Sequence, residues 1–226
     1  MLTFEQVRDN DEVKALIKGS GDVLTAMQYT EHGIRHATYV SYTAGKILQE
    51  LGYSEREVEL AKIAGYLHDI GNIFNRHNHG VNSSLIVYDL LKRLGMSIEE
   101  VITVCSAIGN HEEEIGSVVN NVGAALVIAD KSDAHKTRVK LDNFDPKDIH
   151  DRVNFSIKKN IVMIDADERI IKSKFYMEDS SSVMEYFEIY LSRIIMSEKA
   201  AHFLKCSFSL YFNDVLINSP FEPKSK

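Results

Sequence analysis

Residues 61–72 read AKIAGYLHDIGN, and this stretch places His68 and Asp69 side by side at the end of an apolar helical run. An imidazole and a carboxylate offered together suit a hard or borderline divalent cation, because such ions prefer nitrogen and oxygen ligands. A single pair of this kind is weak evidence, since a histidine at a helix end can equally donate to a backbone carbonyl. The interpretation therefore depends on further ligands elsewhere in the chain.

Further candidate ligands lie in the segments GIRHATYV, RHNHGVNSS, IGNHEEE and ALVIADKSD. They are His36, His79, His111 and Asp130. Six of the nine histidines fall between His32 and His111, which is a strong clustering for a chain of this length. Asp130 ends an apolar run, and a carboxylate buried there is costly unless a cation accompanies it. The pattern predicts a metal site.

Two pairs of histidines lie close together in the sequence, and for each pair we must decide which members are metal ligands. His32 and His36 are four residues apart in a segment predicted to be helical, so they would share one face, as two imidazoles at one metal centre do. The RHNH sequence makes His77 a competitor of His79, and we favour His79. His32 is therefore included among the predicted metal ligands.

The composition describes an ordinary globular protein. A chain of 226 residues with 44% hydrophobic residues can build one large domain, or a domain with an appendage. Its net charge of −7 argues against binding long nucleic acid, which needs clustered lysine and arginine. The apolar runs are much shorter than the ~18 residues of a membrane span, and the acidic N-terminus is unlike a secretory signal. We expect a cytoplasmic protein that does not enter membranes.

The pattern from about residue 22 to about residue 138 is helical throughout. Ser54 and Glu57 have the spacing of a capping box at the start of the helix that leads to the His-Asp pair. Ser97 and Glu100 repeat that spacing before another apolar run. Five helices with short breaks predict an all-α bundle.

The pattern changes after Leu141, where a polar stretch with a proline suggests a boundary. Residues 161–177 form two β-rich runs around a turn and predict a hairpin. Ser180 to Ser182 are expected to cap a long helix, and residues 206–218 alternate as a half-buried strand. We expect residues 1–141 to be a helical metal-binding domain and residues 142–226 to be a small α+β appendage.

The segments RHATYV, YLHDIGN and ALVIADKSDA resemble the His, His-Asp and Asp motifs of the HD superfamily of metal-dependent phosphohydrolases. Motif order, spacing and helical context agree over roughly residues 22–141. The resemblance implies a mainly α fold, with an HD-type helical bundle as its core. It also implies that His36, His68, Asp69 and Asp130 hold a divalent metal, and that Asp69 is the catalytic residue that bridges to a second ion.

The additional histidines resemble those of the multinuclear HD-GYP branch, whose members are cyclic-dinucleotide phosphodiesterases. His79 and His111 match the intervening histidine motifs of that branch, and His32 stands where it can carry a further ligand. The chain departs from the branch in three places. Asn110 replaces one histidine of a pair, Asn72 replaces the lysine of HDIGK, and EEEIGSVVNN replaces the Gly-Tyr-Pro segment. The resemblance therefore predicts the metal site but not that substrate.

We expect an enzyme: an HD-type phosphohydrolase that cleaves a phosphate mono- or diester, nucleotides included, with a metal-activated hydroxide. Its cofactor would be two divalent ions per chain, chosen from manganese, iron, nickel, cobalt and zinc. Lys131 and Arg138 follow Asp130 and are candidates to bind substrate phosphate, and Lys136 is a third. The alternatives are a decayed HD-type signalling or nucleotide- and metal-binding module, and a di-iron oxygenase. The partner would be a small phosphate-containing substrate, and a homodimer is left open.

Overall fold

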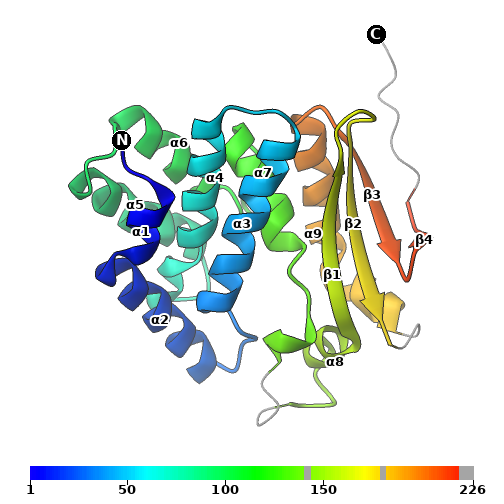
Figure 1. Ribbon diagram of the computed structural model, residues 1–226. Helices are drawn as coiled ribbons and strands as arrows, with labels where there is room; N and C mark the ends of the chain where they lie inside the picture. The colour runs from blue at the N-terminus through cyan, green and yellow to red at the C-terminus, as the bar shows by residue number, and fades with distance from the viewer. Residues whose placement is uncertain (140–143, 179–181, 219–226) are drawn as a thin grey trace.

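The computed structural model describes residues 1–139, 144–178 and 182–218, and Figure 1 shows a helical body beside a small sheet. The body contains α1 (Phe4–Asp9), α2 (Asp11–Ala26), α3 (Ile34–Glu50), α4 (Glu55–Leu67), η1 (Ile70–Ile73), α5 (His79–Arg93), α6 (Ile98–Gly109), α7 (Asn121–Lys131) and η2 (Lys136–Arg138). The remainder contains α8 (Ile149–Ser156), β1 (Ile157–Asp165), β2 (Ile170–Met177), α9 (Ser182–Phe203), β3 (Ser207–Phe212) and β4 (Val215–Leu216). The predicted fold class, mainly helical with a small C-terminal α+β part, is confirmed. The predicted boundary after Leu141 lies outside the described residues.

Helices α3 and α4 pack closely, and their packing fixes the position of the His-Asp pair. Helix α4 starts with the predicted capping box, in which Ser54 and Glu57 each accept a hydrogen bond from the other's backbone N–H. Near its other end, Gly65 lies against α3. A Cβ there would be 2.7 Å from the Cα of Ser41, so only glycine permits this approach. His68, three residues further on, is thereby held against α3.

The second predicted capping box is only half formed. The Ser97 side chain accepts a hydrogen bond from the backbone N–H of Glu100 at 3.4 Å, as expected. The Glu100 carboxylate does not return this contact, because it accepts two hydrogen bonds of 2.6 Å from the guanidinium of Arg56 on α4. A long-range ion pair has replaced the local contact that the sequence predicts.

Helix α7 runs through the centre of the protein. Every residue from Val122 to Lys131 is buried, as its apolar sequence predicts, and the helix contacts α3, α4, α6 and α9. A helix that is apolar on all sides is stable only where neighbours cover it completely. Asp130 lies near the end of this helix and is therefore carried into the interior.

The sheet has the strand order β1-β2-β3-β4 and contains the predicted hairpin. β1 and β2 pair antiparallel, whereas β2 and β3 pair parallel, so the chain must cross over between them. Helix α9 makes this crossover and lies between α7 and the sheet (Figure 1). Its Tyr186 packs against Phe175 and Phe212 on the covered face. Ser180 and Ser181, two of the predicted caps of α9, lie outside the described residues.

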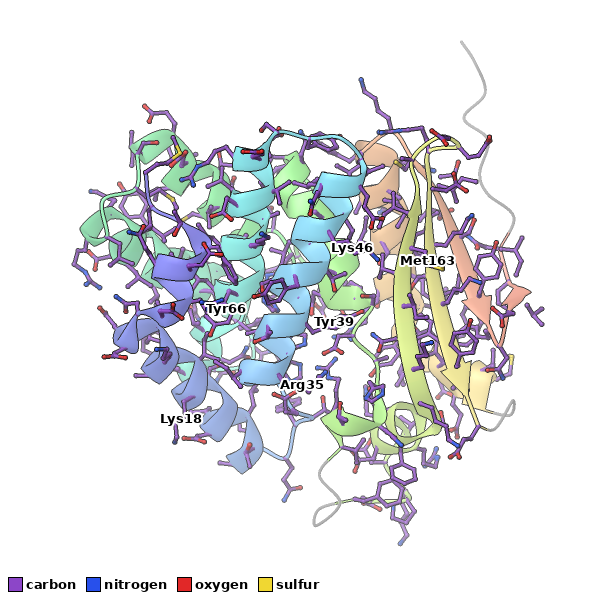
Figure 2. All side chains as sticks on the ribbon, viewed as in Figure 1. Lys18, Arg35, Tyr39, Lys46, Tyr66 and Met163 are labelled. Atoms are coloured by element: carbon purple, nitrogen blue, oxygen red, sulfur yellow. The ribbon has the colours of Figure 1, made fainter. Side chains whose placement is uncertain are left out.

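Polar contacts join the sheet to the helical body along α3. In Figure 2, Tyr39 and Lys46 lie on the side of α3 that faces β1. The amide of Asn160 donates to the Tyr39 hydroxyl at 2.8 Å and to the backbone oxygen of Ser132 at 2.7 Å. Lys46 donates to the backbone oxygen of Val162 at 3.1 Å. The sheet is thus attached to the helical body by side-chain hydrogen bonds as well as by α9.

Among the described helices, none has both the length and the apolar character that a membrane crossing requires.

Gly71 lies where η1 meets the first turn of α5. A Cβ at this position would be 2.3 Å from both the backbone oxygen of His79 and the backbone nitrogen of Ser83. Gly71→Ala should therefore lower the free energy of unfolding by about 1–3 kcal/mol, the usual effect of overpacking. Urea denaturation measures this change. Gly19→Ala in α2 is the matched control, because its Cβ would be 3.7 Å from the nearest atom, and wild-type stability in Gly71→Ala would contradict the account.

Candidate metal centre

Six of the predicted ligands meet in one buried cluster. They are His36 on α3, His68 and Asp69 at the end of α4, His79 at the start of α5, His111 after α6, and Asp130 on α7. None of these residues is more than 6% exposed. The competing residue His77 is exposed on the loop before α5. The histidine that faces the cluster is therefore His79.

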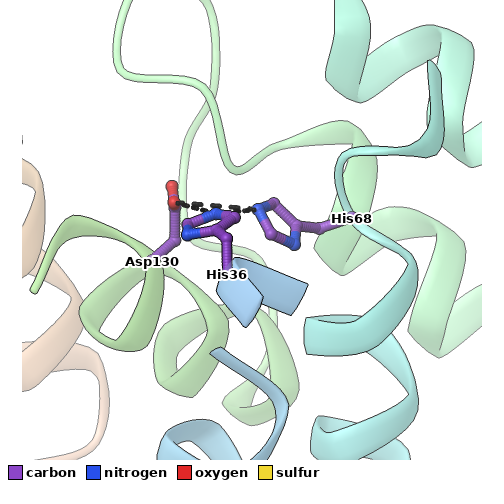
Figure 3. Close-up of side chains that lie close together, drawn as sticks. All are labelled: His36, His68 and Asp130. Carbon is purple, nitrogen blue, oxygen red and sulfur yellow. Dashed lines mark hydrogen bonds and ion pairs between the residues drawn. The ribbon is translucent and has the colours of Figure 1, made fainter. Parts of the chain in front are cut away.

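One half of the cluster gathers two imidazoles and two carboxylates. The Nε2 atoms of His36 and His68 are 3.2 Å apart, and they lie 3.3 and 3.7 Å from Oδ1 of Asp130 (Figure 3). Oδ2 of Asp69 lies 3.6 Å from His36 Nε2 and 3.5 Å from His68 Nε2. Although buried, this oxygen has no hydrogen-bond partner among the described residues. Four donor atoms from α3, α7 and the end of α4 thus converge on one point.

The other half of the cluster forms around the second oxygen of Asp69. Its Oδ1 lies 3.1 Å from Nε2 of His79 and 4.0 Å from Nε2 of His111. These two imidazole nitrogens are 3.1 Å apart. Asp69 therefore presents one carboxylate oxygen to each half of the cluster. Across these halves, two sets of three residues have ligand atoms within 4.8 Å of one another: His36, His68 and Asp130, and His68, Asp69 and His111.

The four imidazoles are oriented by oxygen atoms behind them. Their Nδ1 atoms contact Asp133 Oδ2 (His36, 2.7 Å), Gly65 O (His68, 2.9 Å), Arg76 O (His79, 3.0 Å) and Ile108 O (His111, 2.6 Å). A backbone oxygen can only accept, so Nδ1 is the donor in three of these contacts. In the neutral tautomer that these contacts set, each Nε2 atom has its lone pair toward the cluster. Metal-binding histidines in proteins are commonly held in this way.

The Asp133 carboxylate contacts both His36 and Arg35. Besides the contact with His36, its two oxygens accept hydrogen bonds of 3.2 and 2.7 Å from Arg35, which lies at the start of α3 (Figure 2). Burial opposes ionisation, but the hydrogen bond with His36 and the charge of Arg138 outweigh it and hold the pKa of Asp133 far below its usual value. Asp133 is thus a permanent anion behind His36.

Asp133→Ala should weaken divalent-metal binding about 10–100-fold, the usual result of losing the carboxylate behind a metal-binding histidine. The reason is that His36 would lose the acceptor that fixes both its ring orientation and its tautomer. Competition with a chromophoric chelator measures the affinity. The exposed Asp89 supplies the control, because Asp89→Ala should bind metal like the wild type. Equal affinity in the Asp133 variant would show that His36 needs no such support.

The buried carboxylates stay ionised because cationic groups surround them. Burial alone would raise their pKa values. Around Asp69, the nearby His68 and the hydrogen bond with His79 overcome burial and hold the pKa well below the usual value. Around Asp130, Lys131 and the hydrogen bond with His36 have the same effect. The cluster therefore offers two full negative charges to a bound cation.

The imidazoles differ in their affinity for protons. Burial disfavours protonation of His79, but its hydrogen bonds with Asp69 and Glu112 prevail and raise its pKa to about 9. The pKa of His36 is also raised, because its contacts with carboxylates outweigh burial. Burial, assisted by the neighbouring His79, lowers the pKa of His111 to about 3. The two imidazoles with raised pKa values, His36 and His79, are those that hydrogen-bond to carboxylates.

His32 does not share a helix face with His36, so that prediction is wrong. Helix α3 begins at Ile34 with Gly33 as its N-cap, and His32 lies on the loop before it. Its Nε2 accepts a hydrogen bond of 2.6 Å from Arg138, and its Nδ1 donates to the backbone oxygen of Thr30 at 2.7 Å. Burial and the charge of Arg138 lower its pKa well below the usual value. Both ring nitrogens are occupied by protein groups beside the cluster.

The two predicted phosphate contacts are engaged with protein groups. Lys131 pairs with Oδ2 of Asp130 at 2.9 Å and also with Glu113. Arg138 is only 1% exposed and donates to backbone oxygens of Glu31 and Asp133 as well as to His32. Lys136, the third candidate, lies in η2. In this arrangement Lys131 and Arg138 stabilise the wall of the site.

Sequence reasoning missed three charged residues near the cluster. Glu112 accepts from His79 Nδ1 at 3.0 Å and from the backbone N–H of Gly80 at 2.7 Å. Arg76 approaches the Nε2 of His79 at 3.3 Å. Arg193, on α9, donates to Glu113 at 3.1 Å and so reaches the partner of Lys131. Glu112 could have been suspected because it follows His111, whereas nothing in the sequence indicates that Arg193 is close.

Residues 33–136 match the family model of the HD domain, and this segment, just under half of the chain, contains all six residues of the cluster. The protein is thus similar to HD-domain proteins over the segment that builds the His/Asp cluster. Nothing in the match identifies the HD-GYP branch.

Individual relatives are similar to the chain over different lengths. An uncharacterised protein of Methanocaldococcus jannaschii, MJ1020, is 23% identical over 211 residues, which cover 83% of this chain and 81% of that protein. Ribonuclease Y of Oceanobacillus iheyensis is 34% identical over 116 residues, or 50% of this chain. The chain matches only 20% of the length of that ribonuclease. The crystal structure of a predicted HD superfamily hydrolase from an uncultured Thermotogales bacterium superposes with a TM-score of 0.44 and 24% identity, over 55% of this chain and 67% of that one.

Proposed function

We propose that this protein is a metal-dependent phosphohydrolase that cleaves a phosphate mono- or diester with two divalent ions in the His/Asp cluster. The observation that carries the proposal is the placement of Asp69. Its Oδ2 faces one set of ligands and lacks a hydrogen-bond partner among the described residues, while its Oδ1 faces the other set. A carboxylate in this position is suited to bridge two cations.

The donor atoms fit transition-metal ions. His36, His68, Asp130 and Oδ2 of Asp69 would hold one ion, and His79, His111 and Oδ1 of Asp69 would hold the other. Imidazole nitrogen and carboxylate oxygen accept manganese, iron, nickel, cobalt and zinc. We leave His32 out of this set, because its Nε2 already accepts a hydrogen bond from Arg138.

Bound divalent ions would supply Lewis acidity, which polarises a phosphoryl oxygen and lowers the pKa of water. The protein's own residues then fix the geometry. Asp133 orients His36, and Glu112 orients His79, in each case through Nδ1. Lys131 holds the second oxygen of Asp130 and so directs Oδ1 toward the cluster. These contacts keep the donor atoms in place before substrate arrives.

Two observations bear on the class of substrate. The name of the ribonuclease Y relative denotes an enzyme that acts on RNA, so a phosphodiester is the first class to examine. The net charge of −7 speaks against long nucleic acid and favours a small phosphate compound such as a nucleotide. We therefore propose a small phosphodiester or phosphomonoester as substrate, and a synthetic nitrophenyl diester and monoester as first probes.

The decisive measurement is metal content per chain by plasma mass spectrometry, on protein purified without a chelator or a metal-affinity tag. Two transition-metal ions per chain, with hydrolysis of either nitrophenyl ester, would support the proposal. Less than about half an ion per chain, with none gained from added manganese, iron or zinc, would refute it. Iron together with oxygen consumption would indicate the di-iron oxygenase instead.

A non-catalytic metal- or nucleotide-binding module is the second candidate. It is favoured by Asn110, which stands in place of a histidine and donates to the backbone oxygen of Ser106 at 3.0 Å rather than facing the cluster. It is also favoured by Asn72, which supplies no positive charge. Full metal occupancy without hydrolysis of nucleotides or phosphodiesters would select this function over the first.

A further inference from the structure

A phosphohydrolase site needs positive charge for the phosphate oxygens, in addition to the charge of its metal ions. Most cationic side chains around this cluster are already paired. Lys131 pairs with Asp130 and Glu113, Arg193 with Glu113, Arg35 with Glu31 and Asp133, and the guanidinium of Arg138 donates to two backbone oxygens and His32. Moving any of them onto a substrate would leave a buried carboxylate or imidazole without its partner.

Arg76 differs from these residues. Its Nη1 lies 3.3 Å from Nε2 of His79 and 3.4 Å from Oδ1 of Asn72. Among the described residues, its one carboxylate contact is with Oδ1 of Asp69, at a distance of 3.9 Å. The side chain is 24% exposed, so it connects the buried cluster with solvent. Arg76 is therefore a cation at the ligand atoms that has no close anionic partner.

The contact between Arg76 and His79 cannot persist when a cation is bound. In the neutral imidazole, the Nε2 of His79 carries the lone pair that a second ion would take, and Nη1 of Arg76 lies 3.3 Å in front of this atom. Like charges at such short range repel strongly in a buried site. The guanidinium would be displaced toward its exposed side. It would then lie on the solvent side of the ions, where it can contact an anionic ligand.

We propose that Arg76 binds the phosphate group of the substrate when the metal ions are in place. This inference rests on the function proposed above. Guanidinium groups suit the role, because their planar fork can donate two parallel hydrogen bonds to phosphate oxygens. Asn72 assists by accepting from Arg76 while its amide nitrogen donates to the backbone oxygen of Asp69 at 2.9 Å. Arg76 is thus a substrate-binding residue beside the bridging carboxylate.

The test measures binding of inorganic phosphate to the manganese-loaded full chain by isothermal titration calorimetry. Arg76→Ala should weaken phosphate binding about 10–100-fold, the usual effect of losing a charged hydrogen bond, and should raise KM more than it lowers kcat. Metal content should remain at the wild-type value. Arg76→Lys should recover part of the affinity, because it keeps the charge but not the fork. Arg93→Ala, at the exposed end of α5, is the matched control and should behave as wild type.

The outcomes separate this inference from the proposed function. If the wild type binds two ions and hydrolyses esters while Arg76→Ala binds phosphate equally well, the inference on Arg76 is wrong and the proposed function stands. If Arg76→Ala loses metal ions, Arg76 supports the ligands rather than the substrate, and the inference is again wrong. If the wild type binds no metal, both fail. Arg76→Gln, which keeps the length of the side chain without charge, should match Arg76→Ala, and wild-type affinity in this variant would also overturn the inference.

Discussion

Asp69→Asn should lower ester hydrolysis at least about 1,000-fold, which is the scale expected when a group that acts directly in the chemical step is removed. Asparagine has nearly the same shape as aspartate, so the fold should persist. It lacks the negative charge, however, and its amide nitrogen offers N–H groups in place of one carboxylate oxygen. One of the two sets of donors would then face hydrogens rather than a lone pair. Turnover and metal content, measured on the same preparation, test this expectation.

The matched control is Asp167→Asn, in the exposed turn between β1 and β2, which should retain wild-type turnover and metal content. The two Asp69 oxygens also predict a graded result for the metal. The variant should hold fewer ions than the wild type, since the retained carbonyl oxygen can serve one set of ligands only. An Asp69→Asn protein with both ions and at least a tenth of wild-type turnover would show that Asp69 does not bridge.

Removing the metal should abolish hydrolysis and lower the midpoint of thermal unfolding by about 8–16 °C. A ligand present at a thousand times its dissociation constant stabilises a folded protein by about 4 kcal/mol, and each kcal/mol corresponds to about 2–4 °C in a chain of this size. The physical reason is the pair of ionised, buried carboxylates of Asp69 and Asp130, which a bound cation would neutralise. Scanning calorimetry with chelator and with added manganese measures the difference.

Two histidine variants show whether this stabilisation comes from the cluster. His68→Ala removes a donor that His36 and Asp130 need to hold one ion, so manganese should raise its unfolding temperature clearly less than that of the wild type. His77→Ala, on the exposed loop before α5, should respond like the wild type. An undiminished manganese effect in His68→Ala would place the bound ions elsewhere on the protein.

Local sequence patterns predicted the helices and the positions of the cluster residues along them, because these patterns involve neighbouring residues. The capping box of Ser54 and Glu57 and the apolar run before His68 are examples, and both formed as expected. The error at His32 arose from the same kind of reasoning. A spacing of four residues means a shared face only if the helix includes both residues, and here α3 begins after Gly33. The contact of His32 with Arg138 spans 106 residues and leaves no local pattern.

Charge pairing in the site could not be read from the sequence for a similar reason. Lys131 follows Asp130 directly, and this position made it a plausible phosphate contact. In the structure, however, Lys131 forms an ion pair with Glu113. Glu113 lies 18 residues earlier, and the connection between α6 and α7 brings it close to Lys131. Arg76 was not suspected, because the direction of its side chain depends on the packing of η1 against α5. Long-range packing thus decides which cations near the cluster are available to a ligand.

The insertion of α9 between α7 and the sheet extends the unit that supports the His/Asp cluster beyond the helical body. The family match ends at residue 136, yet Glu113, which holds Lys131 beside Asp130, is itself held by Arg193 on α9. Four side chains of alternating charge therefore run from the metal ligands into the C-terminal part. If the matched segment alone were transferred to another protein, Glu113 would lose its ion pair with Arg193. The transferable unit must include α9, and with it the strands β2 and β3 that α9 connects.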